Sequence, residues 1–340
     1  MQGVAVAVAL AGVMTTGLES AAAQTDSLNT FMIGNSLTDQ QNPEVAFDRI
    51  AGGRGDNWNV EAFTVAGETL DRHWYIHHQQ DGAIDPLVNQ RTWDTVSLQP
   101  YGRHLVDPKA PRDDVSPDWG TLNAAKRFTD YFRSKNPDTT IYIYQSWARP
   151  GNGSFESFDY KSAWDSAYTD PASWDWDKRD FFGQLMDGLR ASKGGDADSP
   201  IHMVPLGDVY YEINERMHAG QFGQYSDIKQ WLADGVHMGW GLPQYTKAAT
   251  FYATMFGEKP DGLDWTVYDG LDIIPRPDLS REQQLEDYVE IDQEMVDLVN
   301  DAVWDVVAGH EYSGVVPEPA SLSLLAVPAG LLLVRHRRGH

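Results

Sequence analysis

The sequence contains no cysteine, and this absence removes several kinds of chemistry at once. Disulfide bonds, thiolate nucleophiles and cysteine-bound zinc or iron–sulfur centres are excluded, so a nucleophile in this chain must be an oxygen or nitrogen group. The absence does not indicate a cytosolic location. A chain of 340 residues with 41 % hydrophobic residues can bury a core that needs no disulfide bond.

Basic residues are scarce as well. The chain has 26 Lys and Arg against 50 Asp and Glu, which gives a formal net charge of −24. A charge of this sign repels nucleic-acid phosphates and anionic membrane surfaces. We therefore expect no nucleic-acid partner.

The amino-terminal end carries a short apolar stretch that is not long enough to span a bilayer. It covers residues 4–14 and is followed by Ala21-Ala22-Ala23 before Gln24. An apolar stretch with a small-residue cleavage site is typical of a secretory signal peptide, here residues 1–23, although no Lys or Arg precedes it. The alternative is a buried amino-terminal helix.

The carboxyl-terminal end has three parts. Val316-Pro317-Glu318-Pro319 precedes an apolar stretch, residues 320–334, and Arg335-His336-Arg337-Arg338 follows it. This tail, 316–340, resembles the PEP-CTERM sorting signal of Gram-negative bacteria. The resemblance implies export to the cell surface, extracellular matrix or periplasm, and cleavage near Pro-Glu-Pro by an exosortase-type transpeptidase. Membrane contact would then be transient and confined to the tail.

Between the two ends, β-rich runs alternate with helical stripes. The runs are continuous rather than alternating in pattern, as in parallel strands that are buried on both faces. They cover residues 30–33, 58–65, 95–98, 140–144 and 201–204. This order predicts a three-layer α/β/α sandwich over residues 24–258, with its site at the carboxyl ends of five parallel strands.

Residues 259–315 form a carboxyl-terminal extension of that domain. Ser280-Arg281-Glu282-Gln283 is a capping box, an apolar face follows it, and Gly309 is a stop signal. We expect a helix over about 281–308, packed on the main domain. Two long Pro-, Gly- and Asp-rich segments, 101–120 and 151–176, are candidates for walls around the site.

Two short motifs carry chemistry. Ser36 follows the first predicted strand directly after Gly34-Asn35, where an α/β site holds a nucleophile. Asp234-Gly235-Val236-His237 lies far downstream, and an Asp–His pair can take the proton of a serine hydroxyl. Each motif also has a structural interpretation, Ser36 as a helix N-cap and His237 as an ordinary surface histidine.

Together the two motifs resemble the first and last sequence blocks of the SGNH (GDSL-type) hydrolases. The blocks are Gly34-Asn35-Ser36-Leu37-Thr38 and Asp234-Gly235-Val236-His237, and the resemblance covers roughly residues 28–256. It implies a flavodoxin-like sheet and a serine ester hydrolase with Ser36 as nucleophile, His237 as base and Asp234 behind it. It requires no metal or cofactor.

The same resemblance implies a carbohydrate O-acyl esterase that acts on substrates such as acetylated polysaccharides. Two alternatives stay open: a lipase or thioesterase for longer acyl chains, and a non-catalytic surface protein that binds carbohydrate.

The resemblance also implies an oxyanion hole, formed by the Ser36 N–H and two further donors. Gly67, after the second strand, is the candidate for the family's glycine, since a backbone N–H without a side chain approaches an oxyanion best. The family's Gly-x-Asn-Asp is absent at the third strand. Gln99 stands in the place of its asparagine and is the third expected donor.

Three further residues are candidates for substrate binding. His73 follows Gly67 closely, Tyr101 follows Gln99, and Trp147, after the fourth strand, could stack on a sugar ring or be purely structural. A metal site is not expected, because the adjacent His77 and His78 point in different directions on any regular element.

Overall fold

The computed structural model describes most of the chain between the two predicted terminal signals. The described residues are 27–40, 42–102, 105, 120–150, 155–168, 177–194, 200–270 and 285–316. The predicted signal peptide, the predicted sorting tail beyond residue 316 and the predicted capping box at 280–283 lie outside them.

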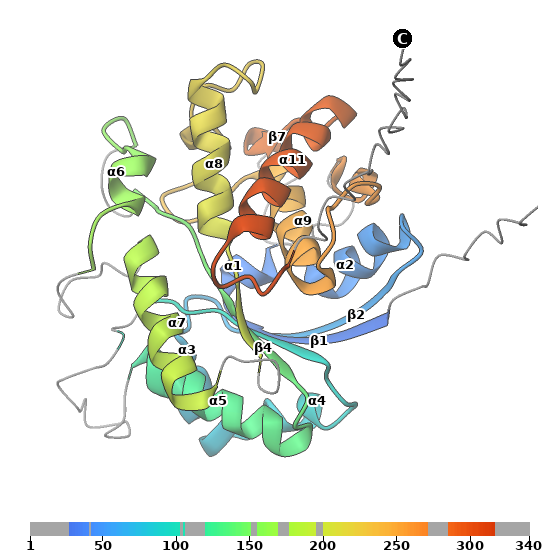
Figure 1. Ribbon diagram of the computed structural model, residues 1–340, viewed down its shortest axis with the longest axis vertical. Coiled ribbons are helices and arrows are strands. Elements are labelled where there is room, and N and C mark those ends of the chain that lie inside the picture. The colour runs from blue at the N-terminus through green and yellow to red at the C-terminus, as the bar shows by residue number, and fades with distance from the viewer. Residues whose placement is uncertain are drawn as a thin grey trace, which may run out of the picture.

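Five parallel strands form the central sheet (Figure 1). They are β1 (Ser27–Gly34), β2 (Asn57–Thr64), β3 (Thr95–Leu98), β4 (Thr140–Tyr144) and β5 (Ile201–Val204). Their spatial order is β2-β1-β3-β4-β5, and every neighbouring pair is parallel. This is the flavodoxin-like order, so the predicted fold class is confirmed.

Helices cover both faces of the sheet (Figure 1). One face carries α3 (Leu70–Arg72), α4 (Asp85–Val88), α5 (Thr121–Lys135) and α7 (Arg179–Lys193). The other carries α2 (Pro43–Gly52), α8 (Leu206–His218), α9 (Leu242–Phe256) and α11 (Gln293–Gly309). The apolar stripes of α5, α7 and α9 face the sheet and are buried, as their spacing predicts.

Short elements fill the connections. They are α1 (Ser36–Asp39), the π-helix η1 (His73–Gln80), α6 (Tyr160–Trp164), the 3₁₀ turns η2 (Ile228–Trp231) and η3 (Trp265–Tyr268), and the strands β6 (Trp240–Gly241) and β7 (Tyr288–Val289). Strands β6 and β7 pair in parallel as a separate two-stranded sheet.

The helix expected over 281–308 is shorter than predicted. Helix α11 begins at Gln293, and its N-cap is Asp292, whose Oδ1 accepts a 2.9 Å hydrogen bond from the Met295 N–H. The preceding residues Tyr288–Val289 form β7 instead. The apolar pattern is therefore interrupted, because these two residues pair with the main domain and Asp292 offers a stronger start signal.

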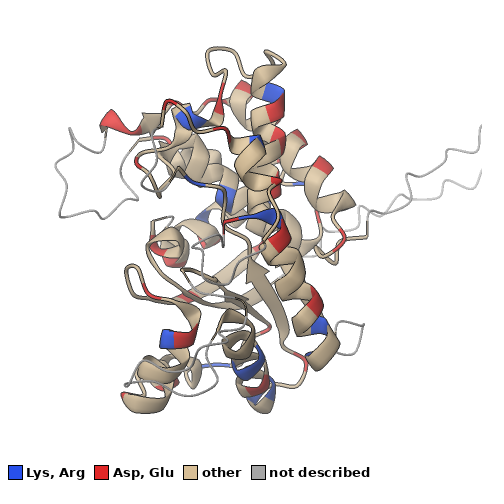
Figure 2. Ribbon diagram, turned by 90° about the vertical axis from the view of Figure 1, so that its left-hand side faces the viewer, with Lys and Arg blue, Asp and Glu red and all other residues tan. Residues whose placement is uncertain are grey.

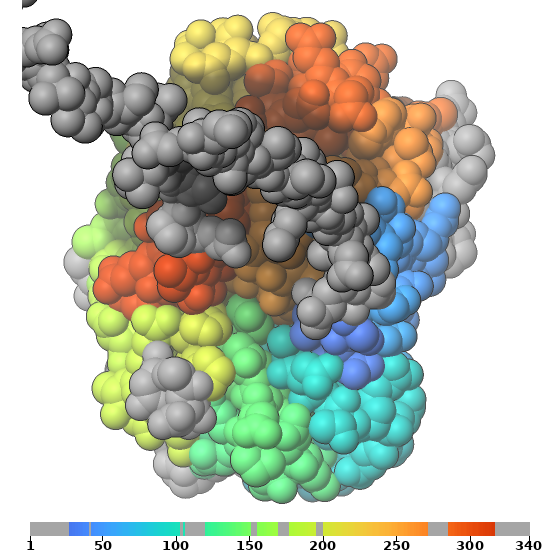
Figure 3. All heavy atoms as spheres, turned by 45° about the vertical axis from the view of Figure 1, so that its right-hand side comes forward, coloured from blue at the N-terminus to red at the C-terminus, as the bar shows by residue number. Residues whose placement is uncertain are grey.

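The last described residues lie along the edge of the sheet. The Met203 N–H of β5 donates a 2.8 Å hydrogen bond to the Tyr312 carbonyl. In Figure 3 this end of the chain, in red, lies against the yellow-green segment of α7 and β5. An edge strand offers unpaired backbone groups to other chains, and this segment covers part of that edge.

Two features of the described residues concern partners. No helix among them is long and apolar enough to cross a membrane. In the view of Figure 2, acidic positions are spread over helices and loops on both sides of the sheet instead of gathering in one place.

Candidate active site

The structure brings Ser36, His237 and Asp234 together at the carboxyl-terminal edge of the sheet. Ser36 is the first residue of α1, directly after β1, and its Oγ lies 2.9 Å from His237 Nε2. The other ring nitrogen, Nδ1, lies 2.8 Å from Asp234 Oδ2. These two contacts form one continuous chain of hydrogen bonds across 201 residues of sequence.

Asp234 is held by its own loop. Its Oδ1 accepts hydrogen bonds from the backbone N–H groups of Val236 at 2.6 Å and His237 at 2.7 Å. Burial alone would raise the pKa of Asp234, but hydrogen bonds from the His237 ring and backbone outweigh it and lower the pKa to about 2. An ionised Asp234 keeps the proton of a neutral imidazole on Nδ1, which leaves Nε2 free to accept the Ser36 proton.

The prediction that the Gln99 amide donates to the oxyanion is wrong, because this side chain is buried and both ends of its amide already have partners. Its side chain is 1 % exposed, and its Nε2 donates to Asn35 Oδ1 at 2.9 Å. Its Oε1 accepts from the Asn35 N–H at 3.0 Å and from Thr38 Oγ1 at 2.7 Å. Both ends of the amide are therefore turned to the backbone and side chains around Ser36, and Gln99 holds the turn that carries Ser36.

Asn35, which the sequence alone did not single out, is the main partner of Gln99. The hydrogen bonds of Gln99 with Asn35 and Thr38 together form a clamp on the turn that carries Ser36. Asn35 Oδ1 caps α1 by accepting from the Leu37 N–H at 3.0 Å, and Asn35 Nδ2 donates to the Glu68 carbonyl at 3.1 Å. The second contact ties the turn after β2 to the turn that carries Ser36. An asparagine directly before a helix start is a capping signal, and the sequence Asn35-Ser36 carried it.

Gly67 lies in that turn after β2. The Glu68 N–H donates to the Val65 carbonyl at 3.0 Å, and Gly67 is exposed with a φ of +68°, a left-handed conformation that suits glycine. The turn lies next to Asn35, because the Glu68 carbonyl accepts the hydrogen bond of Asn35 Nδ2. The role of Gly67 as an oxyanion donor, like that of the Ser36 N–H, stays a prediction.

His73 is buried rather than exposed to a substrate. It opens η1, is 0 % exposed, and its ring packs against those of Phe63 at 5.7 Å and His77 at 5.5 Å. Burial, with the neighbouring His77, lowers the pKa of His73 to about 3, so the ring is neutral. The prediction that it lines the substrate pocket is wrong, since its surface is covered by core residues.

Trp147 is also a core residue. It is 0 % exposed, lies 5.6 Å from the Tyr210 ring, and the Lys247 Nζ sits 4.6 Å above its face. A ring covered on its faces cannot stack on a sugar, so the structural alternative holds for this residue. Burial lowers the pKa of Lys247 to about 7.

Tyr101 is half-buried, three residues beyond the end of β3. The Arg149 guanidinium lies 5.0 Å from its ring and is held by Asp177 through hydrogen bonds of 2.8 and 2.7 Å. Its predicted contact with substrate stays a prediction.

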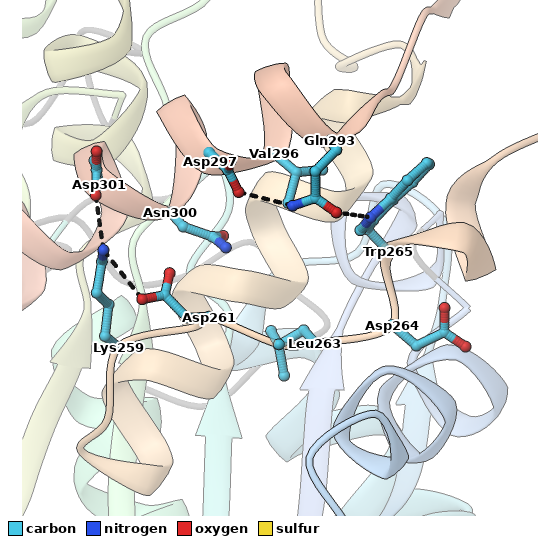
Figure 4. A pocket seen from close by; sticks show the side chains of 11 residues that line it. Lys259, Asp261, Leu263, Asp264, Trp265, Gln293, Val296, Asp297, Asn300 and Asp301 are labelled. Carbon is cyan, nitrogen blue, oxygen red and sulfur yellow. Dashed lines mark hydrogen bonds and ion pairs between the residues drawn. The ribbon is translucent and has the colours of Figure 1, made fainter.

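A cavity of about 350 Å³ lies away from the triad, between the segment 259–265 and α11 (Figure 4). None of the predicted site residues lines it.

Comparison with protein-family models finds no match, and comparison with curated protein sequences finds none either. Solved structures give distant matches. A DUF4886 family protein from Bacteroides uniformis is 16 % identical, with a TM-score of 0.49 over 84 % of this chain and 96 % of that one. A lipase/acylhydrolase from Enterococcus faecalis is 11 % identical, with a TM-score of 0.37 over 68 % and 96 % of the two chains.

A mutant acetyl-xylooligosaccharide esterase from Geobacillus is 14 % identical, with a TM-score of 0.37 over 67 % of this chain and 94 % of that one. At these identities and TM-scores the likeness carries no functional argument. The function is argued from the geometry of the site.

Proposed function

We propose that this chain is a serine ester hydrolase in which Ser36, His237 and Asp234 form the catalytic triad. The observation that carries the proposal is the continuous hydrogen-bond chain from Ser36 Oγ through the His237 ring to Asp234, with contacts of 2.9 and 2.8 Å. A serine hydroxyl is a weak nucleophile, and this arrangement is the one that activates it.

The reaction has two halves. Ser36 Oγ attacks the ester carbonyl while its proton passes to His237 Nε2, and the N–H groups of Ser36 and Gly67 are the proposed donors to the oxyanion. The tetrahedral intermediate then collapses, the alcohol leaves with the proton from His237, and an acyl-Ser36 ester remains. Water, deprotonated by His237, hydrolyses that ester and regenerates Ser36. Asp234 stabilises the imidazolium in both halves.

We further propose a neutral ester, such as an O-acetylated carbohydrate, as the substrate class. The net charge of −24 disfavours anionic substrates and anionic membrane surfaces. Activity that falls steeply on nitrophenyl esters beyond about four acyl carbons would support an acetyl esterase. A preference for long chains would favour the lipase or thioesterase alternative.

The decisive experiment compares the wild type with Ser36→Ala. We expect hydrolysis of p-nitrophenyl acetate to fall by about 10⁴-fold or more, and labelling by a fluorophosphonate probe to disappear. Unchanged activity in the variant would overturn the proposal. Polysaccharide binding by a wild type that is neither labelled nor active would support the non-catalytic alternative.

A further inference from the structure

The loop that carries the proposed base is closed on itself. The Ala233 N–H donates to the His237 carbonyl at 2.9 Å, and the Gly239 N–H donates to the Trp231 carbonyl at 2.7 Å. An antiparallel bridge joins Leu232 to Met238 between these two bonds. These contacts tie loop 231–239 into one unit, so the position of its imidazole depends on what holds the segment that follows.

That segment is β6, and its partner is the carboxyl-terminal extension. Trp240 and Gly241 pair in parallel with Tyr288 and Val289 of β7, and the Trp240 N–H donates to the Asp287 carbonyl at 2.9 Å. The contact joins two segments that are far apart in the sequence. The residue after Gly239 is thus fixed by a strand outside the predicted hydrolase domain.

The two glycines around Trp240 make room for β7. A Cβ atom on Gly239 would lie 2.3 Å from the Asp287 carbonyl oxygen, and one on Gly241 would lie 2.2 Å from the Val289 carbonyl oxygen. Both atoms belong to the backbone, so neither can move aside without shifting β7. The Gly-Trp-Gly sequence after His237 is explained by this close approach.

Contacts within the extension tie α11 to segment 259–265, and a further contact fastens α11 to the main domain. Figure 4 shows Lys259 between Asp261 and Asp301, at 3.1 and 2.7 Å, and the Trp265 Nε1–H donating to Gln293 Oε1 at 3.0 Å. In the core, the Tyr245 hydroxyl donates to Asn300 Oδ1 at 2.8 Å. These contacts hold α11, and with it the strand directly before α11.

We propose that β7, together with the Asp287 carbonyl directly before it, is a positioning element of the catalytic site: its backbone fixes the loop that carries Asp234 and His237. The inference rests on the proposed function and extends it to a part of the chain outside the two matching sequence blocks.

The backbone contact is tested with Gly239→Ala in the full-length protein. The matched control is Gly183→Ala in α7, where a Cβ meets no atom within 4 Å. We expect Gly239→Ala to lower kcat at least about tenfold. The added Cβ atom displaces the loop that carries His237, and a displacement of about 1 Å at a catalytic group can lower the rate by about 100-fold. We also expect it to weaken the low-field NMR signal of the His237 Nδ1 proton. The control should change neither.

The two readouts separate the inference from the proposed function. An unchanged kcat and Nδ1 proton signal in a folded Gly239→Ala protein would overturn the positioning role. If Gly239→Ala does not fold, hydrogen exchange at the Trp240 N–H of the wild type decides: protection supports the contact with the Asp287 carbonyl, and exchange as fast as in exposed loops would overturn it. A wild type that hydrolyses no ester would contradict the proposed function and leave the positioning role open. In that case the His237 Nδ1 proton signal of wild type and Gly239→Ala still tests whether β7 holds the loop.

Discussion

The variant Gln99→Met tests whether Gln99 positions the turn that carries Ser36 or donates a hydrogen bond to the oxyanion. Methionine keeps the length of the side chain and removes the amide, so the hydrogen bonds to Asn35 Oδ1, the Asn35 N–H and Thr38 Oγ1 are lost together. At about 1 kcal/mol for each bond, the protein loses about 3 kcal/mol of stability. For a domain of this size that corresponds to a fall in Tm of roughly 6–12 °C.

The catalytic effect is expected to accompany the loss of stability. Without the clamp the turn that carries Ser36 is free to shift, and a displacement of about 1 Å costs on the order of 100-fold in rate. Thermal unfolding and kcat on p-nitrophenyl acetate measure the two quantities in one preparation. Gln184→Met, a substitution on an exposed part of α7, is the control and should leave both unchanged.

The two roles differ in one result. A residue that only donates to the oxyanion should lower kcat by about 100 to 1,000-fold with an unchanged Tm, because its amide would make no bond in the resting protein. A Tm for Gln99→Met within about 1 °C of the wild type would therefore refute the clamp.

Three further predictions follow from single residues. The pKa of Asp234 is lowered from 3.8 to about 2, so the stability that its ionised form contributes is present above about pH 4 and is lost as the pH falls through 2. Urea unfolding midpoints between about pH 4 and 2 should show this loss in the wild type and not in Asp234→Asn. The folded-state pKa of Lys247 is about 7 against an ordinary 10.5, so the wild type should gain Tm from pH 7 to 10, while Lys247→Met, without the buried amine, should not. Trp147→Phe should lower stability by about 1–3 kcal/mol and leave KM for an acetylated saccharide unchanged, whereas a raised KM at constant Tm would restore Trp147 to the substrate pocket.

The sheet was predictable because its signals are local. The bounds of β3, β4 and β5 agree with the predicted runs, since short apolar segments that are buried on both faces stand out from the polar sequence around them. Their carboxyl ends meet at one edge by topology alone. Residues near those ends, Ser36 among them, could therefore be assigned to a common site before any distance was known.

Features that depend on distant contacts were not predictable. The π-helix η1 and the two-residue ladder between β6 and β7 have no periodicity that a sequence pattern can detect. The direction of the Gln99 amide is set by Asn35 and Thr38, not by its own segment. A tryptophan such as Trp147 is equally compatible with a pocket and a core until its neighbours are placed.

The hydrogen bonds of Gln99 form one clamp on the site, and the contact between β7 and β6 forms a second. Together they lead to a prediction for a protein that carries both substitutions. Gln99 holds the turn of Ser36, β7 holds the loop of His237, and the 2.9 Å contact between Ser36 Oγ and His237 Nε2 needs both to be in place. Once either clamp is lost, the contact is already impaired, so the losses in kcat of Gln99→Met and Gly239→Ala should be far less than multiplicative in the double variant.

Their losses of stability should instead add, because the two substitutions break different contacts in different parts of the fold. Thermal unfolding and kcat of the four proteins of this double-mutant cycle measure both quantities. Multiplicative losses in kcat would mean that the clamps act on separate steps, and that the Ser36–His237 contact is not what they share.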